Sequence, residues 1–163
     1  MHTKTAATIV LSLFVTAACS GLERAKAPVP PAEIVIDDTL VFPESVTATK
    51  AGTLFTGSSK GTIYRAEPGN LRARPWIRAS ESNGLLSVLG VLADERTGTL
   101  WACSVPSPFK GAPPANGRPS ALMAFDLESG KQKGVYPFPP PASACNDVAV
   151  AADGTVFATD TPN

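Results

Sequence analysis

The sequence predicts an all-β fold built from repeated four-stranded sheets, the plan of a β-propeller, and three observations support that prediction. A Gly-Thr hairpin recurs three times among the 163 residues, around Gly52, Gly98 and Gly154. In each copy the Gly-Thr pair is followed by Leu or Val and then by an aromatic residue. The copies recur at roughly 50-residue intervals, within the range of propeller repeats. Such hairpins also occur in β-sandwiches, but three aligned copies favour the propeller.

The first 19 residues read as an export signal rather than as part of the fold. Ala6 to Ala18 is an apolar run that is shorter than the roughly 20 residues needed to span a bilayer. Val15 to Cys19 resembles the bacterial lipobox, in which the cysteine becomes the lipidated N-terminus, although Thr16 stands where Leu is usual. The alternative is ordinary signal cleavage, with Cys19 incidental. Both readings predict an exported protein, either periplasmic or anchored to the outer membrane of a bacterium.

A Pro-rich tether follows the signal and leads into the folded domain. Residues 20–32 are polar and then rich in proline, a composition typical of an extended linker that holds a domain away from a membrane. The folded domain is placed at 33–163, and Ile34-Val35-Ile36 is its first expected strand. The 16 prolines and 13 glycines of the whole chain favour turns over long helices.

The first copy of the repeat contains enough strands for one complete sheet. The hairpin around Gly52 is followed by an expected turn at Gly57–Gly61 and by a strand at Thr62–Arg65. After a second turn, Arg74–Arg78 supplies a fourth strand. Four antiparallel strands make one propeller blade.

The second copy is longer because of a Pro-rich loop at Val105–Pro119, which precedes strands at Ser120–Asp126 and Gly134–Tyr136. The third copy has two strands, Asp147–Ala151 and Thr155–Thr159. Two and a half blades cannot close a ring without exposing sheet edges. We therefore expect the chain to be the first part of a longer protein; the alternative is a ring closed by several chains.

Composition argues against several kinds of function. Lys+Arg 14 balances Asp+Glu 14, and no long basic run occurs, so nucleic acid is not an expected partner. The one histidine, His2, lies in the signal, which argues against a His-based triad and a zinc site in the mature chain. Ser104, Ser107 and Ser143 have no base partner, and no Gly-rich phosphate loop precedes a helix.

Two cysteines are predicted to lie close together. Cys103 ends the second strand of one blade, and Cys145 begins the first strand of the next. In an up-and-down blade these strand ends lie on the same face, and an exported protein resides where disulfides persist. We expect a bridge or a close approach; the alternative is two buried, small apolar side chains.

Several segments together resemble the senescence-marker-protein family, which includes gluconolactonase, regucalcin and luciferin-regenerating enzyme. They are Pro43-Glu44-Ser45-Val46, Gly61–Arg65, and Asn146–Val150 followed by Gly154–Phe157. The resemblance covers about Leu40 to Thr161. It implies a six-bladed propeller with a divalent cation, commonly calcium, at the channel mouth, and metal-dependent hydrolysis of a sugar lactone or related ester.

The resemblance also implies metal ligands. In the family a Glu opening the first blade, an Asn opening the third and a later Asp hold the ion, and the first two correspond to Glu44 and Asn146. Their oxygens are of the type that calcium prefers, and the starts of inner strands point into the channel. Asp147 and Asp160 are alternative carboxylates near the same rim. Without the resemblance, Glu44 and Asn146 would be read as ordinary loop and turn residues.

Two departures limit what this chain is expected to do alone. The family's substrate-facing Asn aligns with Leu89-Gly90, and the later Asp would lie beyond Asn163. The whole protein is therefore expected to be either a lactone or ester hydrolase or a non-catalytic lipoprotein that binds a ligand or protein partner. In both cases a lipid anchor would be its only membrane attachment.

The loops on the face that carries Glu44 and Asn146 are candidate specificity elements. They are the turn at Gly57–Gly61, the loop at Val105–Pro119 and the segment Pro137–Ala144. Three residues are predicted to contact an anionic or sugar-like ligand: Phe109, Lys110 and Arg118. Asp147 is a fourth predicted rim residue. The alternative is an ordinary surface loop with no ligand.

Overall fold

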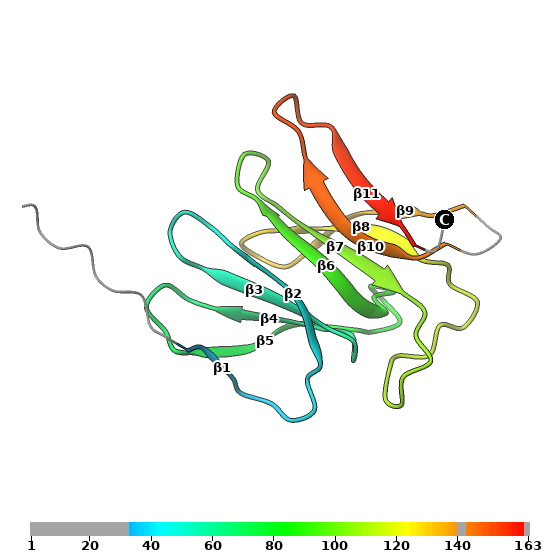
Figure 1. Ribbon diagram of the computed structural model, residues 1–163, viewed down its shortest axis with the longest axis horizontal. Helices are drawn as coiled ribbons and strands as arrows, with labels where there is room; N and C mark the ends of the chain where they lie inside the picture. The colour runs from blue at the N-terminus through cyan, green and yellow to red at the C-terminus, as the bar shows by residue number, and fades with distance from the viewer. Residues whose placement is uncertain (1–32, 140–142, 162–163) are drawn as a thin grey trace, which may run out of the picture.

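The computed structural model describes residues 33–139 and 143–161, which form three β-sheet units (Figure 1). The predicted export signal, Cys19 and the Pro-rich tether at 20–32 lie outside the described residues. Within the described ranges there is no helix long and apolar enough to cross a membrane.

The first sheet, called blade 1, contains the Gly52 hairpin and the two strands predicted to follow it. Its spatial order is β1-β5-β4-β3-β2. The strand bounds are β1 Val35–Ile36, β2 Pro43–Ala48, β3 Leu54–Ser58, β4 Thr62–Ala66 and β5 Arg72–Arg78.

One detail of blade 1 was not predicted from the sequence, and another differs from the prediction. β1 pairs in parallel with the outer strand β5, so the start of the domain covers the outer edge of the blade. The expected turn at Gly57–Gly61 begins later, because Gly57 and Ser58 still pair with β4 opposite Ile63 and Thr62. The turn is therefore confined to Ser59–Gly61.

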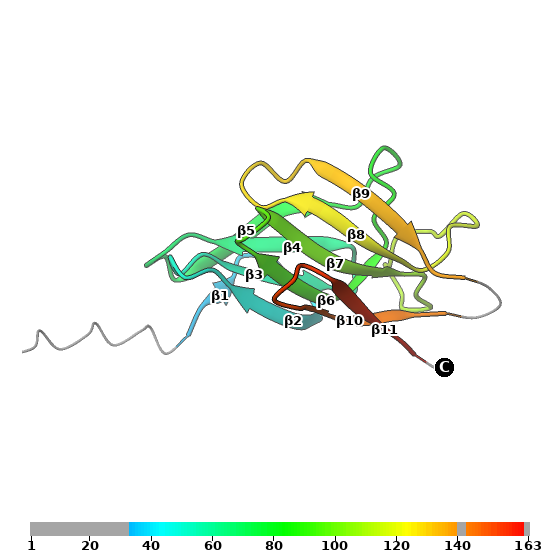
Figure 2. The same cartoon turned by 90° about the horizontal axis from the view of Figure 1, so that it is seen from above.

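The second sheet, blade 2, is a four-stranded meander, and the third unit is a hairpin. Blade 2 contains β6 Ser87–Asp94, β7 Thr99–Val105, β8 Ala121–Asp126 and β9 Gln132–Pro137. The hairpin, called blade 3, contains β10 Cys145–Val150 and β11 Val156–Asp160. Figures 1 and 2 show the inner strands β2, β6 and β10 following one another, and β6 contacts both of the others. The prediction of two and a half propeller blades is confirmed.

The three predicted hairpin turns share one backbone feature. Gly52, Gly98 and Gly154 have φ angles of 93°, 60° and 93°. These positive values are readily adopted by glycine and rarely by other residues. The repeated glycine therefore marks a conformational requirement of each inner hairpin.

The blades are held together by apolar packing between their faces. One cluster joins blades 1 and 2 through fully buried side chains that include Phe55, Ile63, Val88 and Phe125. A second cluster, between blades 2 and 3, is formed by Cys103, Val105, Leu122, Cys145 and Val148. Apolar area removed from water stabilises this arrangement by roughly 25 cal/mol per Å².

A disulfide reinforces the second cluster. Cys103 on β7 is bonded to Cys145 on β10, and their Cα atoms are 5.0 Å apart. The bond crosses from blade 2 to blade 3, where the sequence predicted a bridge or a close approach. It therefore fixes the start of β10, directly before Asn146.

Candidate functional site

Each of the three inner strands contains a β-bulge near its start. Along each bulge the inner strand advances three residues while its partner advances two. The breaks fall between Pro43 and Val46, between Val88 and Val91, and between Cys145 and Val148. Because a bulge bends its strand and redirects side chains, its repetition makes the three strand starts equivalent.

Each bulge leaves two residues outside the regular pairing. They are Glu44 and Ser45 in β2, Leu89 and Gly90 in β6, and Asn146 and Asp147 in β10. The candidate metal ligands Glu44 and Asn146 thus occupy the same bulge position. Leu89 occupies that position in blade 2, where the resemblance placed the missing Asn.

Neighbouring bulges contact one another directly. The main-chain N–H of Val91 donates a hydrogen bond of 3.2 Å to Ser45 Oγ. On the other side of β6, a Cβ placed on Gly90 would lie 2.6 Å from the carbonyl oxygen of Asn146 and 2.8 Å from Asp147 Cα. A side chain cannot fit there, so Gly90 allows the backbones of β6 and β10 to meet at the site.

The side chains of Glu44 and Asn146 are exposed and uncommitted. Within the described residues neither forms a hydrogen bond through its side chain, and Glu44 forms no ion pair. The alternative carboxylates are used differently: Asp147 Oδ1 accepts the N–H of Val148, and Asp160 Oδ1 accepts the N–H of Ala144. Glu44 and Asn146 are therefore better placed to bind an added ligand.

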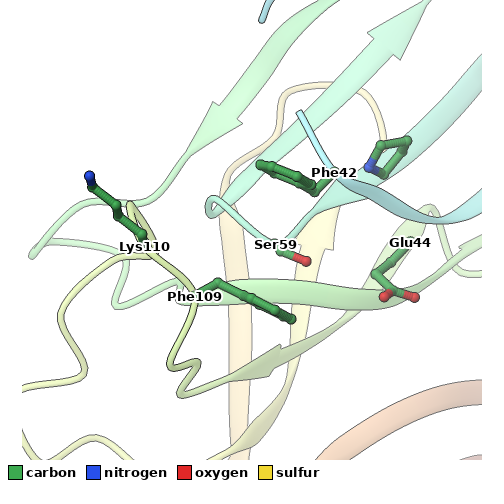
Figure 3. A pocket seen from close by; sticks show the side chains of 6 residues that line it. Phe42, Glu44, Ser59, Phe109 and Lys110 are labelled. Atoms are coloured by element: carbon green, nitrogen blue, oxygen red, sulfur yellow. The ribbon is translucent and has the colours of Figure 1, made fainter. Parts of the chain in front are cut away.

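A cavity of about 400 Å³ lies beside Glu44 (Figure 3). We call it the Glu44 pocket, and its lining residues are Phe42, Pro43, Glu44, Ser59, Phe109 and Lys110. It joins the start of β2 to the long loop of blade 2. The structure thus brings Glu44 together with two of the predicted rim residues, Phe109 and Lys110.

The remaining predicted rim residues lie elsewhere. Arg118 lines a separate cavity with Ser80 and Leu85, although the sequence grouped it with Phe109 and Lys110. The reason is that the loop folds back, so that Arg118 reaches within 3.7 Å of the point where a Cβ on Gly84 would lie. Asn146 and Asp147 lie at the bulge of β10, outside the lining of the Glu44 pocket.

Phe42 is a pocket residue that sequence reasoning missed. Its φ angle of 49°, like that of Leu40 at 53°, lies in the left-handed region that bulky residues rarely adopt. Two hydrogen bonds hold the segment: Ser58 Oγ donates to the carbonyl of Val41, and the N–H of Ser59 donates to the carbonyl of Phe42 at 3.2 Å. No local sequence signal marks this conformation, because it depends on the turn after β3.

The long loop is also locally organised. Ser107 Oγ accepts a hydrogen bond of 3.2 Å from the N–H of Phe109. Lys60, in the turn after β3, places its ammonium 5.6 Å from the centre of the Phe42 ring. Lys60 also approaches the loop, with its Cε 3.4 Å from the point where a Cβ on Gly111 would lie. Lys60 therefore lies near both Phe42 and the long loop.

Comparison with known proteins supports the fold. Residues 32–66 match a family model described as strictosidine synthase-like, N-terminal. A structure from Thermus thermophilus, described as a putative oxidoreductase (glucose dehydrogenase), aligns at 16% identity and a TM-score of 0.57, over 78% of this chain and 39% of that one. A protein of unknown function from Bacteroides caccae aligns at 16% identity and a TM-score of 0.48, over 74% of this chain and 39% of that one. No curated protein sequence matches the chain.

These matches agree with the sequence prediction at the level of fold and resemblance. The Thermus structure shows that the fold is part of a β-propeller. The family-model match to blade 1, together with that propeller match, supports the resemblance to the gluconolactonase and regucalcin family. The chain spans well under half the length of either similar structure.

Proposed function

We propose that the whole protein is an exported, divalent-metal-dependent hydrolase of a lactone or related ester, in which Glu44 and Asn146 are two of the metal ligands. One observation carries this proposal: the repeated bulges give these two residues equivalent positions at the starts of inner strands. Inner strands surround the channel of a propeller, so equivalent positions on different blades converge on one region.

The chemistry of the two side chains fits calcium. Calcium takes six to eight oxygen ligands, which include carboxylates and amide carbonyls. Glu44 and Asn146 supply one of each, exposed and without a competing hydrogen bond in the described part of the chain. That part contains no cluster of three or more His, Cys, Asp or Glu side chains, so the other ligands would be water and residues elsewhere.

A bound ion would polarise the carbonyl of the substrate and lower the pKa of a bound water. The residues of this chain would position the substrate for that step. Phe42 and Phe109 would exclude water beside Glu44, and Gly90 would keep the bulge of β10 against β6 so that Asn146 stays in place.

A hydrolysis assay tests the proposed activity. The whole protein is incubated with glucono-δ-lactone, and separately with the aromatic lactone dihydrocoumarin, after treatment with a chelator and then with added calcium. We expect hydrolysis of at least one of the two lactones above its spontaneous rate, and only when the ion is present. Equal rates with chelator and with calcium for both lactones contradict a metal-dependent hydrolase.

Export and lipid anchoring are part of the same proposal. They rest on the apolar segment before Cys19, and the disulfide between Cys103 and Cys145 is consistent with an oxidising compartment. Labelled fatty acid should be incorporated into the protein in a bacterial host and lost in Cys19→Ala. Incorporation that survives this substitution contradicts anchoring at Cys19.

A second candidate is a non-catalytic propeller lipoprotein that binds a ligand or protein partner. Leu89 favours it, because an apolar, partly buried side chain occupies the bulge position where the resemblance places a substrate-facing Asn. Calcium binding without hydrolysis of any lactone or ester would favour this second function.

A further inference from the structure

The Glu44 pocket has mainly apolar walls. Phe42 and Phe109 are 55% and 67% exposed, and together with Pro43 they line the same cavity. In Figure 3 the two rings lie on either side of Ser59. Exposed aromatic side chains gathered around a cavity are typical of ligand sites.

The position of Phe42 is imposed by the surrounding structure. An aromatic residue at a φ of 49° persists only where other contacts over-determine the backbone. The hydrogen bonds from Ser58 to Val41 and from Ser59 to Phe42 do so here. The strain thus fixes one aromatic wall of the pocket beside Glu44.

The pocket has opposite charges at its two ends. Figure 3 shows Glu44 on one side of the aromatic rings and Lys110 on the other, with the Lys110 ammonium directed outward from the rings. Lys110 forms no salt bridge within the described residues. Lys60 adds a second cation next to the Phe42 ring. An anionic group would therefore be favoured at the end that holds Lys110.

Once Glu44 holds the ion and Lys110 an anionic group, few groups in the pocket remain to bind the hydroxyls of a sugar. Ser59 is the only neutral side chain among the six lining residues that offers a hydroxyl or amide group. A polyhydroxylated ring that leaves water must find a partner for each hydroxyl, because an unpaired buried polar group is costly. The lining therefore disfavours a bare sugar lactone.

We infer that the Glu44 pocket selects a lactone or ester whose body is aromatic or otherwise flat and apolar, with its carbonyl at Glu44 and an anionic group at Lys110. The role of Glu44 here rests on the proposed function. The selectivity itself depends on Phe42, Phe109 and Lys110, so it can be tested without metal and without turnover.

Three small probes separate the contribution of the aromatic walls from that of the positive charge: 3-phenylpropionate, 3-phenylpropanol and gluconate. Each is titrated into the whole protein in the presence of a chelator, and binding is followed by ligand-observed NMR. We expect the phenyl acid to bind about two- to fivefold more tightly than the alcohol, as for one exposed ion pair. Gluconate should bind most weakly. Equal affinities for acid and alcohol, or tighter binding of gluconate, would overturn the inference.

Matched variants assign the effect to residues. Lys110→Gln should abolish the preference for the acid, whereas Lys131→Gln, in an exposed turn of blade 2, should keep it. Phe109→Ala should weaken both phenyl probes by about three- to tenfold, whereas Leu71→Ala, also exposed, should not. If Lys110→Gln behaves like Lys131→Gln, or Phe109→Ala like Leu71→Ala, the inference is wrong.

The two proposals fail in different ways. A protein that hydrolyses glucono-δ-lactone with calcium but does not bind 3-phenylpropionate would contradict the inferred selectivity of the pocket and would support the proposed hydrolase function. A protein that binds 3-phenylpropionate through Phe109 and Lys110 but has no metal-dependent hydrolysis would support the pocket and contradict the hydrolase.

Discussion

Cys103 in blade 2 is disulfide-bonded to Cys145 in blade 3, one residue before the candidate ligand Asn146. The bond closes a sequence separation of 42 residues and lies within the buried cluster between the two blades. It therefore links the stability of the third blade to the geometry of the proposed metal site.

Removing the disulfide should destabilise the protein and weaken the site. Bridges of this kind typically contribute about 2–4 kcal/mol, chiefly by restricting the unfolded chain. The double substitution Cys103→Ala with Cys145→Ala should lower the free energy of unfolding by an amount in that range. Denaturant unfolding with intact and reduced wild type provides the comparison. If reduced wild type and the double variant both unfold at the same denaturant midpoint as intact wild type, the bond does not constrain the fold.

Gly90→Ala should also be destabilising, because the new Cβ would meet main-chain atoms of Asn146 and Asp147 at 2.6 and 2.8 Å. Overpacking of this kind costs about 1–3 kcal/mol. Gly134→Ala is a suitable control, since its nearest neighbour would be the flexible, exposed side chain of Tyr136 at 3.0 Å. Thermal unfolding of both variants checks this expectation. An equal loss of stability in Gly90→Ala and Gly134→Ala would contradict it.

The repeated hairpins were predictable from the sequence because glycine at a positive φ is a local requirement. The pairing of the cysteines followed from the order of strands in a blade. The bulges were not predictable, since a bulge is defined by the register of two strands and leaves no fixed residue signature. The site is therefore clearer in the structure: Glu44 and Asn146 share a bulge position, and Leu89 marks the equivalent position in blade 2.

Residues whose position depends on distant contacts were the hardest to predict. Phe42 adopts its conformation because Ser58 and Ser59 bond to the neighbouring carbonyls. Arg118 belongs to the same loop as Phe109, yet the loop directs it to another cavity. The pairing of β1 with β5 likewise depends on an edge that forms only after blade 1 has folded.

Tyr64 should make the stability of blade 1 depend on pH above neutrality. Burial, and then its hydrogen bond of 2.8 Å to Asp38, raises the pKa of Tyr64 to about 12. The stabilisation is complete below the unfolded pKa of about 10 and is lost as the pH rises from about 10 towards 12. Between pH 8 and 12 the denaturant midpoint of wild type should fall towards that of Tyr64→Phe, so that the two converge. A constant difference would contradict this role.

Asp38 should make the stability of blade 1 depend on pH in acid. The hydrogen bond from Tyr64 is the main cause that lowers the pKa of Asp38, and the N–H of Thr39 and the positive charge of Arg78 act in the same direction. A carboxyl pKa that is lower in the folded than in the unfolded protein stabilises the fold at pH values above the unfolded pKa of about 3.9. This contribution is lost as the pH falls through the pKa of the folded protein. Tyr64→Phe should therefore reduce the loss of stability in acid, as measured by denaturant unfolding at pH 5 and below. An undiminished loss would show that the bond to Tyr64 is not responsible.

Calcium titration by calorimetry tests most directly whether Glu44 and Asn146 form one metal site. Even supporting residues around a metal contribute about 10–100-fold to affinity, so removing a direct ligand should cost at least about tenfold. We expect the whole protein to bind calcium, and Glu44→Gln and Asn146→Ala each to weaken binding by that factor. Glu81→Gln, an exposed control outside the inner strands, should bind as wild type. Absence of binding heat, or equal affinity in wild type and both ligand variants, would contradict the proposed site.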